Sequence, residues 1–348
     1  MSQEESKSHQ LPSSMVSQEL GEVNILVKGD VAEVLFTVLM EPSGEEAEGW
    51  ETGVALDASI SMKWAYGKKL EGKIPPELMQ EYSSKGWIEA QNLDGLAVKS
   101  VNKEAKQDAI ARGFLKNSEN IMQSLGRNFI EYLSSHLDAH GKTTVVYWAC
   151  NEGSDYEVIG EIESEACPSL KLEGPVKHSF GKGTNILPVL KYYWNRFEKS
   201  KRAMAIFLTD GHIEDFGDVK NFSIEMAKAV EAQEHGFMKC VLVGVGEAIS
   251  LEQMEELDDL DTGTSVDIWD HKIAKEMRSL LEIFAEVVDE NKIVAPTAMI
   301  YDDQGNLIKK FADGMPAKVV FEMPVTSKFF DLVVGESKIR QTIQAPQE

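Results

Sequence analysis

The sequence predicts an α/β fold: a Rossmann-like, mostly parallel sheet flanked by helices, with a smaller all-β sandwich beside it. In the middle of the chain, short and continuously apolar runs alternate with helical stretches. This alternation is typical of parallel strands buried on both faces. Towards both ends the pattern changes to strands in which apolar and polar residues alternate, joined by hairpin turns, which is typical of a sandwich.

Four apolar runs are the expected strands of the parallel sheet. They cover residues 53–56, 143–150, 203–208 and 240–245. The stretches between and after them carry apolar residues at helical spacing, which predicts helices that cover the sheet. These expected helices cover residues 118–137, 186–197, 218–233 and 273–288.

The two flanks are expected to form one sandwich. Strands at 22–28 and 31–40 are joined by a Gly29-Asp30 turn, and two strands alone rarely form a stable sheet. We therefore expect them to join strands of the other flank, at 297–301, 307–311, 317–323, 329–334 and 339–343. The predicted domains are a disordered tail at 1–20, a sandwich from 21–50 and 291–348, and an α/β domain at 51–290 with an insertion at about 63–117.

Charge and cysteine content limit the classes of function. The chain has 58 acidic and 35 basic residues, a net charge of −23, which disfavours nucleic acid and anionic membranes as partners and favours cations. The same acidity is also explained by solubility alone. Cys150 and Cys240 each lie in an apolar run, which indicates buried free thiols. The three cysteines, with Cys167, are few and far apart, which disfavours a disulfide scaffold or a zinc site. With no long apolar run and a polar start, we expect a cytoplasmic protein without a membrane span.

The motif Asp57-Ala58-Ser59-Ile60-Ser61 directly follows the first apolar run. One carboxylate and two hydroxyls at alternate positions can converge at the carboxyl end of a strand, where open α/β sheets bind ligands. Oxygen donors of this kind suit a hard cation such as Mg²⁺.

Two further segments strengthen this motif, which is weak when taken alone. Gly183-Thr184-Asn185 offers a hydroxyl at the start of a predicted helix. Asp210, in Thr209-Asp210-Gly211, offers a second carboxylate at the end of another apolar run. Oxygen donors on three loops of one sheet edge indicate a metal site.

The order DxSxS, then a threonine in a GTN context, then TDG resembles the metal-ion-dependent adhesion site of von Willebrand factor A domains. The resemblance covers about residues 51–290 and is nearest to the copine-like and bacterial intracellular domains. It implies that a metal, Mg²⁺ with Mn²⁺ or Ca²⁺ as alternatives, is held by Asp57, Ser59, Ser61, Thr184 and Asp210. It also implies an open coordination position that an Asp or Glu carboxylate of a partner protein fills.

The expected function is therefore metal-dependent protein binding, within a larger assembly by analogy with intracellular family members. One alternative is a scaffold whose metal only stabilises the fold. A weaker alternative is a Mg²⁺-dependent phosphoryl-transfer or hydrolytic enzyme, because the sequence has no P-loop, no second carboxylate cluster and no nucleophile with a base. We therefore predict no catalytic residues.

Further residues near these motifs are weaker candidates. Aromatic side chains in the insertion and a histidine after Asp210 would contact a partner, although the aromatics could equally pin the insertion to the body. Because the insertion begins beside Ser61 and is unusually long, it could cover the metal face. The partner-contacting candidates are Trp64, Tyr66, Trp87 and His212. Asp215, His178, Lys182 and the acidic run 252–261 are interpreted as exposed loop or helix positions.

Overall fold

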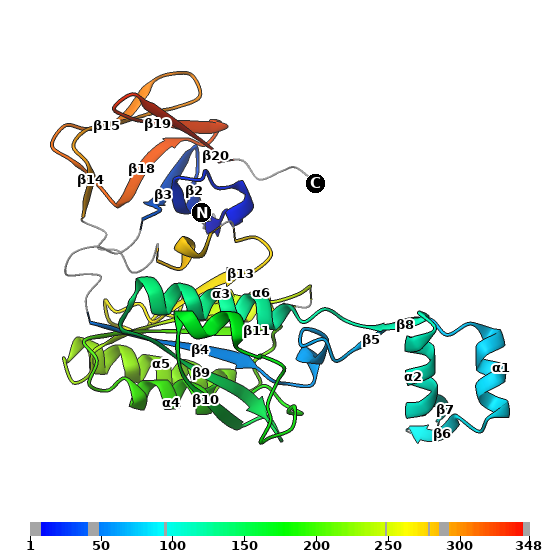
Figure 1. Ribbon diagram of the computed structural model, residues 1–348. Coiled ribbons are helices and arrows are strands. Elements are labelled where there is room, and N and C mark those ends of the chain that lie inside the picture. The colour runs from blue at the N-terminus through cyan, green and yellow to red at the C-terminus, as the bar shows by residue number, and fades with distance from the viewer. Residues whose placement is uncertain are drawn as a thin grey trace, which may run out of the picture.

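The computed structural model describes residues 8–40, 49–93, 96–247, 249–277, 279–284 and 292–343. The predicted mixed α/β class is confirmed. Figure 1 shows three parts: a sheet flanked by helices, a separate group of strands above it, and an arm that projects to one side. Among the described residues, no helix is both long and apolar enough to cross a membrane.

The central sheet has six strands in the order β10-β9-β4-β11-β12-β13. Four neighbouring pairs are parallel, and only the edge pair β9–β10 is antiparallel, so the sheet is mixed. The edge strands β10 and β13 were not predicted. In β10, buried and exposed positions are interspersed, so it lacks the continuous apolar run of the inner strands. The bounds are β4 Trp50–Asp57, β9 Asp138–Cys150, β10 Asp155–Glu163, β11 Arg202–Thr209, β12 Phe237–Gly244 and β13 Trp269–Ile273.

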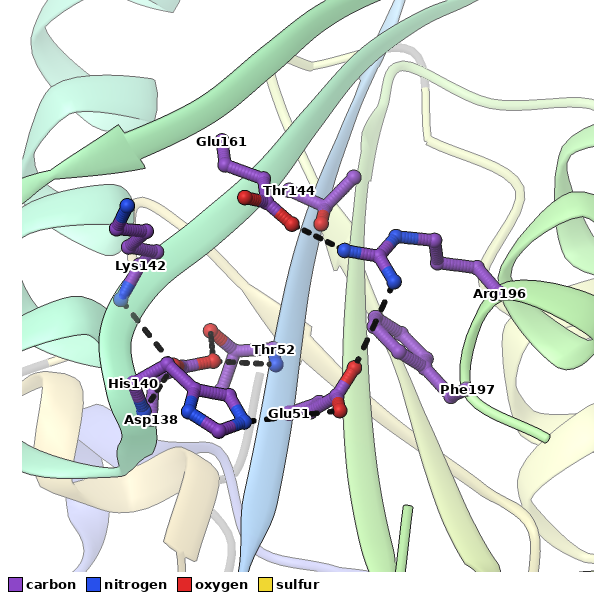
Figure 2. Close-up of a pocket in the computed structure, with 9 residues that line it drawn as sticks. All are labelled: Glu51, Thr52, Asp138, His140, Lys142, Thr144, Glu161, Arg196 and Phe197. Carbon is purple, nitrogen blue, oxygen red and sulfur yellow. Dashed lines mark hydrogen bonds and ion pairs between the residues drawn. The ribbon is translucent and has the colours of Figure 1, made fainter. Parts of the chain in front are cut away.

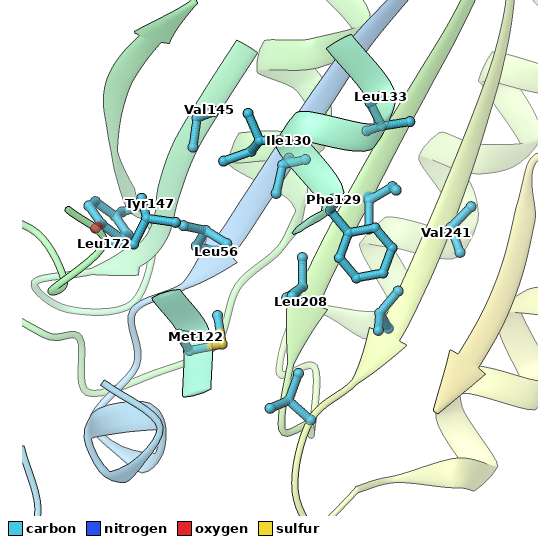
Figure 3. Close-up of a cluster of buried hydrophobic side chains, with 14 of the residues drawn as sticks. Leu56, Met122, Phe129, Ile130, Leu133, Val145, Tyr147, Leu172, Leu208 and Val241 are labelled. Carbon is cyan, nitrogen blue, oxygen red and sulfur yellow. The ribbon is translucent and has the colours of Figure 1, made fainter. Parts of the chain in front are cut away.

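Helices cover both faces of this sheet. Helix α3 (Ile121–His136) packs Phe129 against Leu208 and its neighbours on one face (Figure 3). The other face carries alternate strand residues such as Ala55 and Phe207, covered by three helices. These are α4 Leu187–Arg196, α5 Phe216–Glu231 and α6 Leu251–Asp258. Because strand side chains alternate between faces, both faces of each inner strand must be apolar.

The helix predicted at 273–288 is wrong where the structure describes it. Ile273 ends strand β13, and after a turn the chain forms only the short 3-10 helix η5 (Leu280–Phe284). The helical spacing was misleading because Ile273 packs into the core on one face of the sheet, whereas Met277 and Leu280 pack against the core on the other face. Residues 285–288 of the predicted helix lie outside the described residues.

The strands of the two flanks pair with each other. Strand β3 (Val31–Val38) pairs with β18 (Lys318–Pro324) across almost the whole length of the chain. Two four-stranded sheets, β1-β2-β3-β18 and β16-β15-β19-β20, share one core, in which Phe36 stacks on Phe330 with ring centroids 5.5 Å apart. The remaining bounds are β1 Ser8–Gln10, η1 Ser13–Met15, β2 Leu20–Lys28, β14 Ile293–Ala295, β15 Ala298–Tyr301, β16 Leu307–Phe311, β17 Met315–Pro316, β19 Phe329–Val334 and β20 Ser337–Thr342.

The prediction of a disordered tail at 1–20 is wrong for residues 8–20. Leu11 and Val16 are buried in the core shared by the two sheets, at 3% and 6% exposure. The Ser17 backbone N–H donates to Gln341 Oε1 at 2.7 Å, which ties this segment to β20. The polar composition concealed two apolar anchors that join a core built from both ends of the chain. Residues 1–7 lie outside the described residues.

The insertion forms a projecting arm. A two-stranded connection leads away from the body to two helices and a hairpin (Figure 1). The arm has its own small core, in which Trp87 packs on Tyr82 at 5.6 Å between ring centroids. The helices and hairpin of the insertion therefore do not cover the metal face, a possibility that its length had left open, because the β5–β8 connection carries them away from the sheet. The bounds are β5 Leu70–Gly72, α1 Pro76–Ser84, β6 Ile88–Leu93, β7 Leu96–Val101, α2 Lys103–Ala111 and β8 Leu115–Asn117.

The three cysteines are buried free thiols, as predicted for Cys150 and Cys240. Burial raises the pKa of Cys150 to about 12 and also raises the pKa values of Cys167 and Cys240. Thiols held in this state are poor nucleophiles and poor metal ligands. Their role in the fold is therefore packing.

Candidate functional site

The topology of the central sheet brings the ends of β4 and β11 together. The chain passes from β4 to β9 on one side and then crosses to β11 on the other side of β4. Ligands of open α/β sheets bind at such a reversal, outside the carboxyl ends of the strands. Asp57 is the last residue of β4, and Asp210 directly follows β11.

A chain of hydrogen bonds links three of the predicted metal residues. Ser59 Oγ and Ser61 Oγ are 2.8 Å apart, and Ser61 Oγ donates to Asp210 Oδ1 at 3.1 Å. Ser61 begins the short 3-10 helix η3 (Ser61–Trp64), which turns its hydroxyl back towards the end of β11. The structure thus brings the DxSxS motif and the TDG motif together.

Asp57 lies at the bottom of this site and is fully buried. Its Oδ1 accepts from the Ser59 backbone N–H at 2.7 Å, and its Oδ2 accepts from Thr209 Oγ1 at 2.7 Å. Burial raises the pKa of Asp57 to about 7, although these hydrogen bonds oppose the shift and Asp210 adds to it. Burial also raises the pKa of Asp210. Both carboxyl groups lie where a cation would stabilise their ionised forms.

Thr209 is a site residue that the sequence reasoning overlooked. Its hydroxyl donates to Asp57 and accepts from the Gly211 backbone N–H at 3.0 Å, so it holds the buried carboxylate and the TDG turn together. The signal was present in the sequence, because Thr209 lies within the motif. It was treated there only as context for Asp210.

Thr184 is brought to the same edge through its backbone. Its carbonyl accepts from the Glu214 N–H at 3.0 Å, which joins the GTN loop to the loop after β11. Ahead of it, Ser59 and Gly181 form a parallel bridge, so the GTN loop also runs beside the DxSxS motif. Thr184 itself is partly buried. The five predicted residues therefore come from three loops that contact one another.

The aromatic residues after the motif have positions that were not predicted. Trp64 donates a side-chain hydrogen bond to Asp210, and a Cβ placed on Gly246 would come within 2.6 Å of its ring. Tyr66 is 97% buried and its hydroxyl donates to the Asp57 carbonyl at 2.8 Å. Trp64 thus contacts the Asp210 carboxylate, and Tyr66 holds the backbone of Asp57. Their predicted role as partner contacts is untested, and the burial of Tyr66 leaves little of its ring accessible.

The other candidates at this edge lie around the site. His212 is exposed, whereas Asp215 accepts from the backbone N–H groups of Ile186 and Leu187 at 3.0 and 2.9 Å and so caps the start of α4. The interpretation of Asp215 as a solvated loop residue is therefore wrong. Lys182 is exposed and paired with Glu152 at 2.9 Å.

Backbone strain is concentrated near the same edge. Of the three described non-glycine residues with positive φ, Ala149 (56°) and Asn151 (55°) lie at the end of β9. An alanine rarely adopts this conformation, and such strain is typical of functional sites. The backbone approaches closely at this point, because a Cβ on Gly181 would come within 1.9 Å of the Ala149 carbonyl oxygen. A glycine at position 181 therefore allows the segment before the GTN loop to run beside Ser59.

The opposite edge of the sheet carries a polar pocket of about 400 Å³ (Figure 2). Its charged groups pair among themselves: Arg196 binds Glu161 and lies 3.9 Å from Glu51, and Glu51 is 3.9 Å from His140. Asp138 accepts from the Thr52 backbone N–H at 2.8 Å. Charges that are neutralised within the protein do not require a ligand, so this pocket is a weaker candidate.

A third polar group lies at the edge strand β13. Asp258, Asp270 and His271 place ligand atoms within 4.8 Å of one another. However, His271 Nδ1 pairs with Asp258 at 2.8 Å, and Lys272 pairs with Asp270 at 3.0 Å. Burial raises the pKa of Asp258 to about 6, and the Asp258 hydrogen bond raises that of His271 although burial opposes it. The protein supplies its own cations here.

No protein-family model matches the chain, and a search of curated proteins finds no match. The arguments for a function therefore come from the geometry. At the β4–β11 edge, two carboxylates and the hydroxyls beside them offer only oxygen donors, and exposure rises from buried Asp57 to exposed Ser61. This donor set fits Mg²⁺, which takes few protein oxygens and keeps other positions for water or a ligand.

Proposed function

We propose that this protein is a metal-dependent protein-binding module built on a von Willebrand factor A-type domain. Asp57, Ser59, Ser61, Thr184 and Asp210 would hold Mg²⁺, with Mn²⁺ or Ca²⁺ as alternatives. A carboxylate from a partner protein would complete the coordination shell. The strand order and the loops that carry these residues support the proposal.

One observation carries the proposal: Asp57 is fully buried beside Asp210 and has only neutral hydrogen-bond donors. An ionised carboxylate in such a position is costly unless a cation neutralises it. Hydroxyl groups from Ser59 and Ser61 add donors without adding charge. A divalent cation held by so few charges stays electrophilic and would attract another carboxylate.

The exposure of the site residues also favours a partner protein over a small enclosed substrate. Ser61 is exposed and Asp210 is half-buried, whereas Asp57 and Ser59 are buried below them. Pocket-like enclosure is the usual feature of small-molecule sites. A protein surface that presents one carboxylate fits a shallow site of this kind.

Isothermal titration calorimetry with Mg²⁺ tests the metal site. We expect one binding event in the wild type and none in Asp57→Asn, which keeps the shape of the side chain but removes its charge. Asp313→Asn is the matched control, because Asp313 is exposed on the sandwich. Absence of binding of Mg²⁺, Mn²⁺ and Ca²⁺ by the wild type would contradict the proposal.

Capture of partners from a cell lysate tests the second part of the proposal, that a partner protein binds through the metal. Wild-type protein is immobilised in Mg²⁺ or in EDTA, with Asp57→Asn beside it. A partner that is retained only by the wild type in Mg²⁺ supports recognition through the metal. A partner retained under all three conditions would instead favour the scaffold alternative, in which the metal only stabilises the fold.

A further inference from the structure

Exposed lysines recur along the segment that begins next to Ser61 of the candidate metal site. The segment that leads from η3 into the arm carries four of them in eleven residues, although the chain as a whole has a net charge of −23. We call this cluster the lysine collar; it consists of Lys63, Lys68, Lys69 and Lys73, all of which are exposed.

Two collar lysines share one aromatic ring. The Nζ atoms of Lys63 and Lys68 lie 5.6 and 5.5 Å from the centroid of Phe180, and the Lys68 backbone N–H donates to the Lys63 carbonyl at 2.9 Å. Phe180 immediately precedes Gly181, whose carbonyl accepts from the Ile60 N–H at 2.7 Å. Lys63 and Lys68 therefore adjoin the loop that carries Ser59 and Ser61, and Lys69 and Lys73 follow them along the segment that leads into the arm.

The collar lysines have no carboxylate partner among the described residues. No described Asp or Glu oxygen lies within 4.0 Å of their Nζ atoms, whereas nearby Lys182 pairs with Glu152 and Lys116 pairs with Glu71 at 3.7 Å. Cation–π contact with Phe180 stabilises two of the ammonium groups but does not neutralise them. Like charges held this close repel each other, and an anion between them would remove that repulsion.

The acidity of the rest of the chain does not neutralise the collar at a distance. At physiological ionic strength the Debye length is about 8 Å, so a ligand at this edge responds mainly to the local charges. Those charges are the lysines of the collar, the Asp57 and Asp210 carboxylates with any bound cation, and the Lys116–Glu71 pair at the base of the arm. A long polyanion such as nucleic acid would extend beyond the collar over the acidic body, but a short acidic peptide would not.

We infer that the lysine collar binds an acidic peptide segment of the partner, whose carboxylates face the lysines while one of them reaches the metal. This inference rests on the proposed function, and it names the chemistry of the partner. The metal supplies a single strong contact, and the collar selects for further acidic residues beside it. The collar thereby makes binding both charge-dependent and salt-dependent.

A fluorescent decaglutamate peptide is the probe, and its binding is followed by fluorescence anisotropy in excess Mg²⁺. The collar variant carries Lys63→Gln, Lys68→Gln, Lys69→Gln and Lys73→Gln. We expect it to bind the peptide at least tenfold more weakly and with a shallower salt dependence. Because these side chains are exposed, circular dichroism is expected to show an unchanged fold.

The matched control removes the same number of positive charges elsewhere. Lys171, Lys199, Lys201 and Lys228 are exposed, and substituting all four by glutamine is expected to change the peptide affinity by less than twofold. Calorimetry with Mg²⁺ separates this inference from the proposed function. The collar variant is expected to bind Mg²⁺ at least as tightly as the wild type, because four positive charges near the site are gone.

Each outcome has a distinct meaning. Equal peptide affinity in the collar variant and the wild type would overturn the inference, and the Mg²⁺ titration would still decide the metal site independently. Equal peptide binding in Mg²⁺ and EDTA would overturn it too, because the metal contact would be absent. Tighter binding of a single-stranded DNA oligonucleotide than of the peptide would overturn it in favour of nucleic acid.

Discussion

Two buried aspartates in different parts of the molecule have opposite electrostatic environments. Asp57, at the edge of the central sheet, is fully buried, and its neighbours are hydroxyls, a backbone N–H and another carboxylate. Asp331, in β19 of the sandwich, is 5% exposed and binds Arg340 at 2.8 Å and Lys338 at 2.7 Å. Burial raises the pKa of Asp57 to about 7, whereas the Arg340 hydrogen bonds lower that of Asp331.

This difference indicates that the Asp331 carboxylate has a structural role, whereas the Asp57 carboxylate is a candidate for a functional one. Asp331 carries its own cations, so its ionised form stabilises the fold without a ligand. Asp57 has no such partner at the described edge, and its ionised form would be stabilised by a cation from solution. The polar pocket at the opposite edge of the sheet resembles the Asp331 environment, because its acidic and basic side chains pair with one another.

The largest expected effect concerns the difference in unfolding free energy between Asp57→Asn and the wild type. This difference is expected to change sign when Mg²⁺ binds. In EDTA at pH 8, Asp57→Asn is expected to be more stable than the wild type by about 2 kcal/mol, because it removes a buried charge that lacks a cation. With Mg²⁺ at a hundred times its Kd, the wild type should gain about 2.7 kcal/mol and the variant nothing. Urea unfolding in both conditions measures the four free energies. If the metal-free variant were less stable than the wild type, Asp57 would not be an uncompensated buried charge, and the contrast with Asp331 would be wrong.

Asp331→Asn is expected to destabilise the fold by about 2 kcal/mol at pH 7, since it removes charge-assisted hydrogen bonds to Arg340 and Lys338. The folded pKa of Asp331 is lower than the ordinary value of 3.8, so its ionised form stabilises the fold at neutral pH. This contribution disappears as the pH falls below 3.8 through the lowered value. The unfolding free energies of the wild type and the variant should therefore converge as the pH is lowered from 7 to 2. A constant difference over that range would show that packing, rather than charge, is responsible.

Ser61→Ala is expected to weaken Mg²⁺ binding about tenfold, equivalent to ~1.4 kcal/mol, with little change in stability. The reason is that Ser61 offers an exposed hydroxyl to the site, and its loss removes only one hydrogen bond each from Ser59 and Asp210. Calorimetry measures the affinity, and Ser169→Ala, an exposed serine away from the site, is the control. Unchanged affinity would remove Ser61 from the proposed ligand set.

The smallest effect is expected from Trp64→Phe, which keeps an aromatic ring against Gly246 but removes the hydrogen bond to Asp210. A lost hydrogen bond at a partly exposed site costs about 0.5–1 kcal/mol, so Mg²⁺ affinity should fall twofold to fivefold. Calorimetry again measures it. A loss as large as that of Asp57→Asn would mean that the indole, rather than the carboxylates, dominates the site.

The sequence by itself predicted the features that depend on local patterns. The inner strands of the central sheet are continuously apolar because both of their faces are buried, and this made them recognisable. The flanking hairpins were recognisable from their turn residues. Gly29, for example, has a φ of 65°, a conformation that favours glycine. The candidate metal residues were recognised because oxygen-bearing side chains followed apolar strands in two places and preceded a predicted helix in a third.

The tertiary structure alone decided what depends on distant partners. The order of residues could not show that Thr209 holds Asp57, that Trp64 donates to Asp210, or that Leu11 and Val16 anchor the amino-terminal segment. The edge strands β10 and β13 were missed because edge positions lack the continuous apolar signal of inner strands. The arm was misjudged because the direction in which a hairpin leaves a sheet is set by packing at its base. Local periodicity reports which face of an element is buried, but only the assembled fold determines what that face contacts.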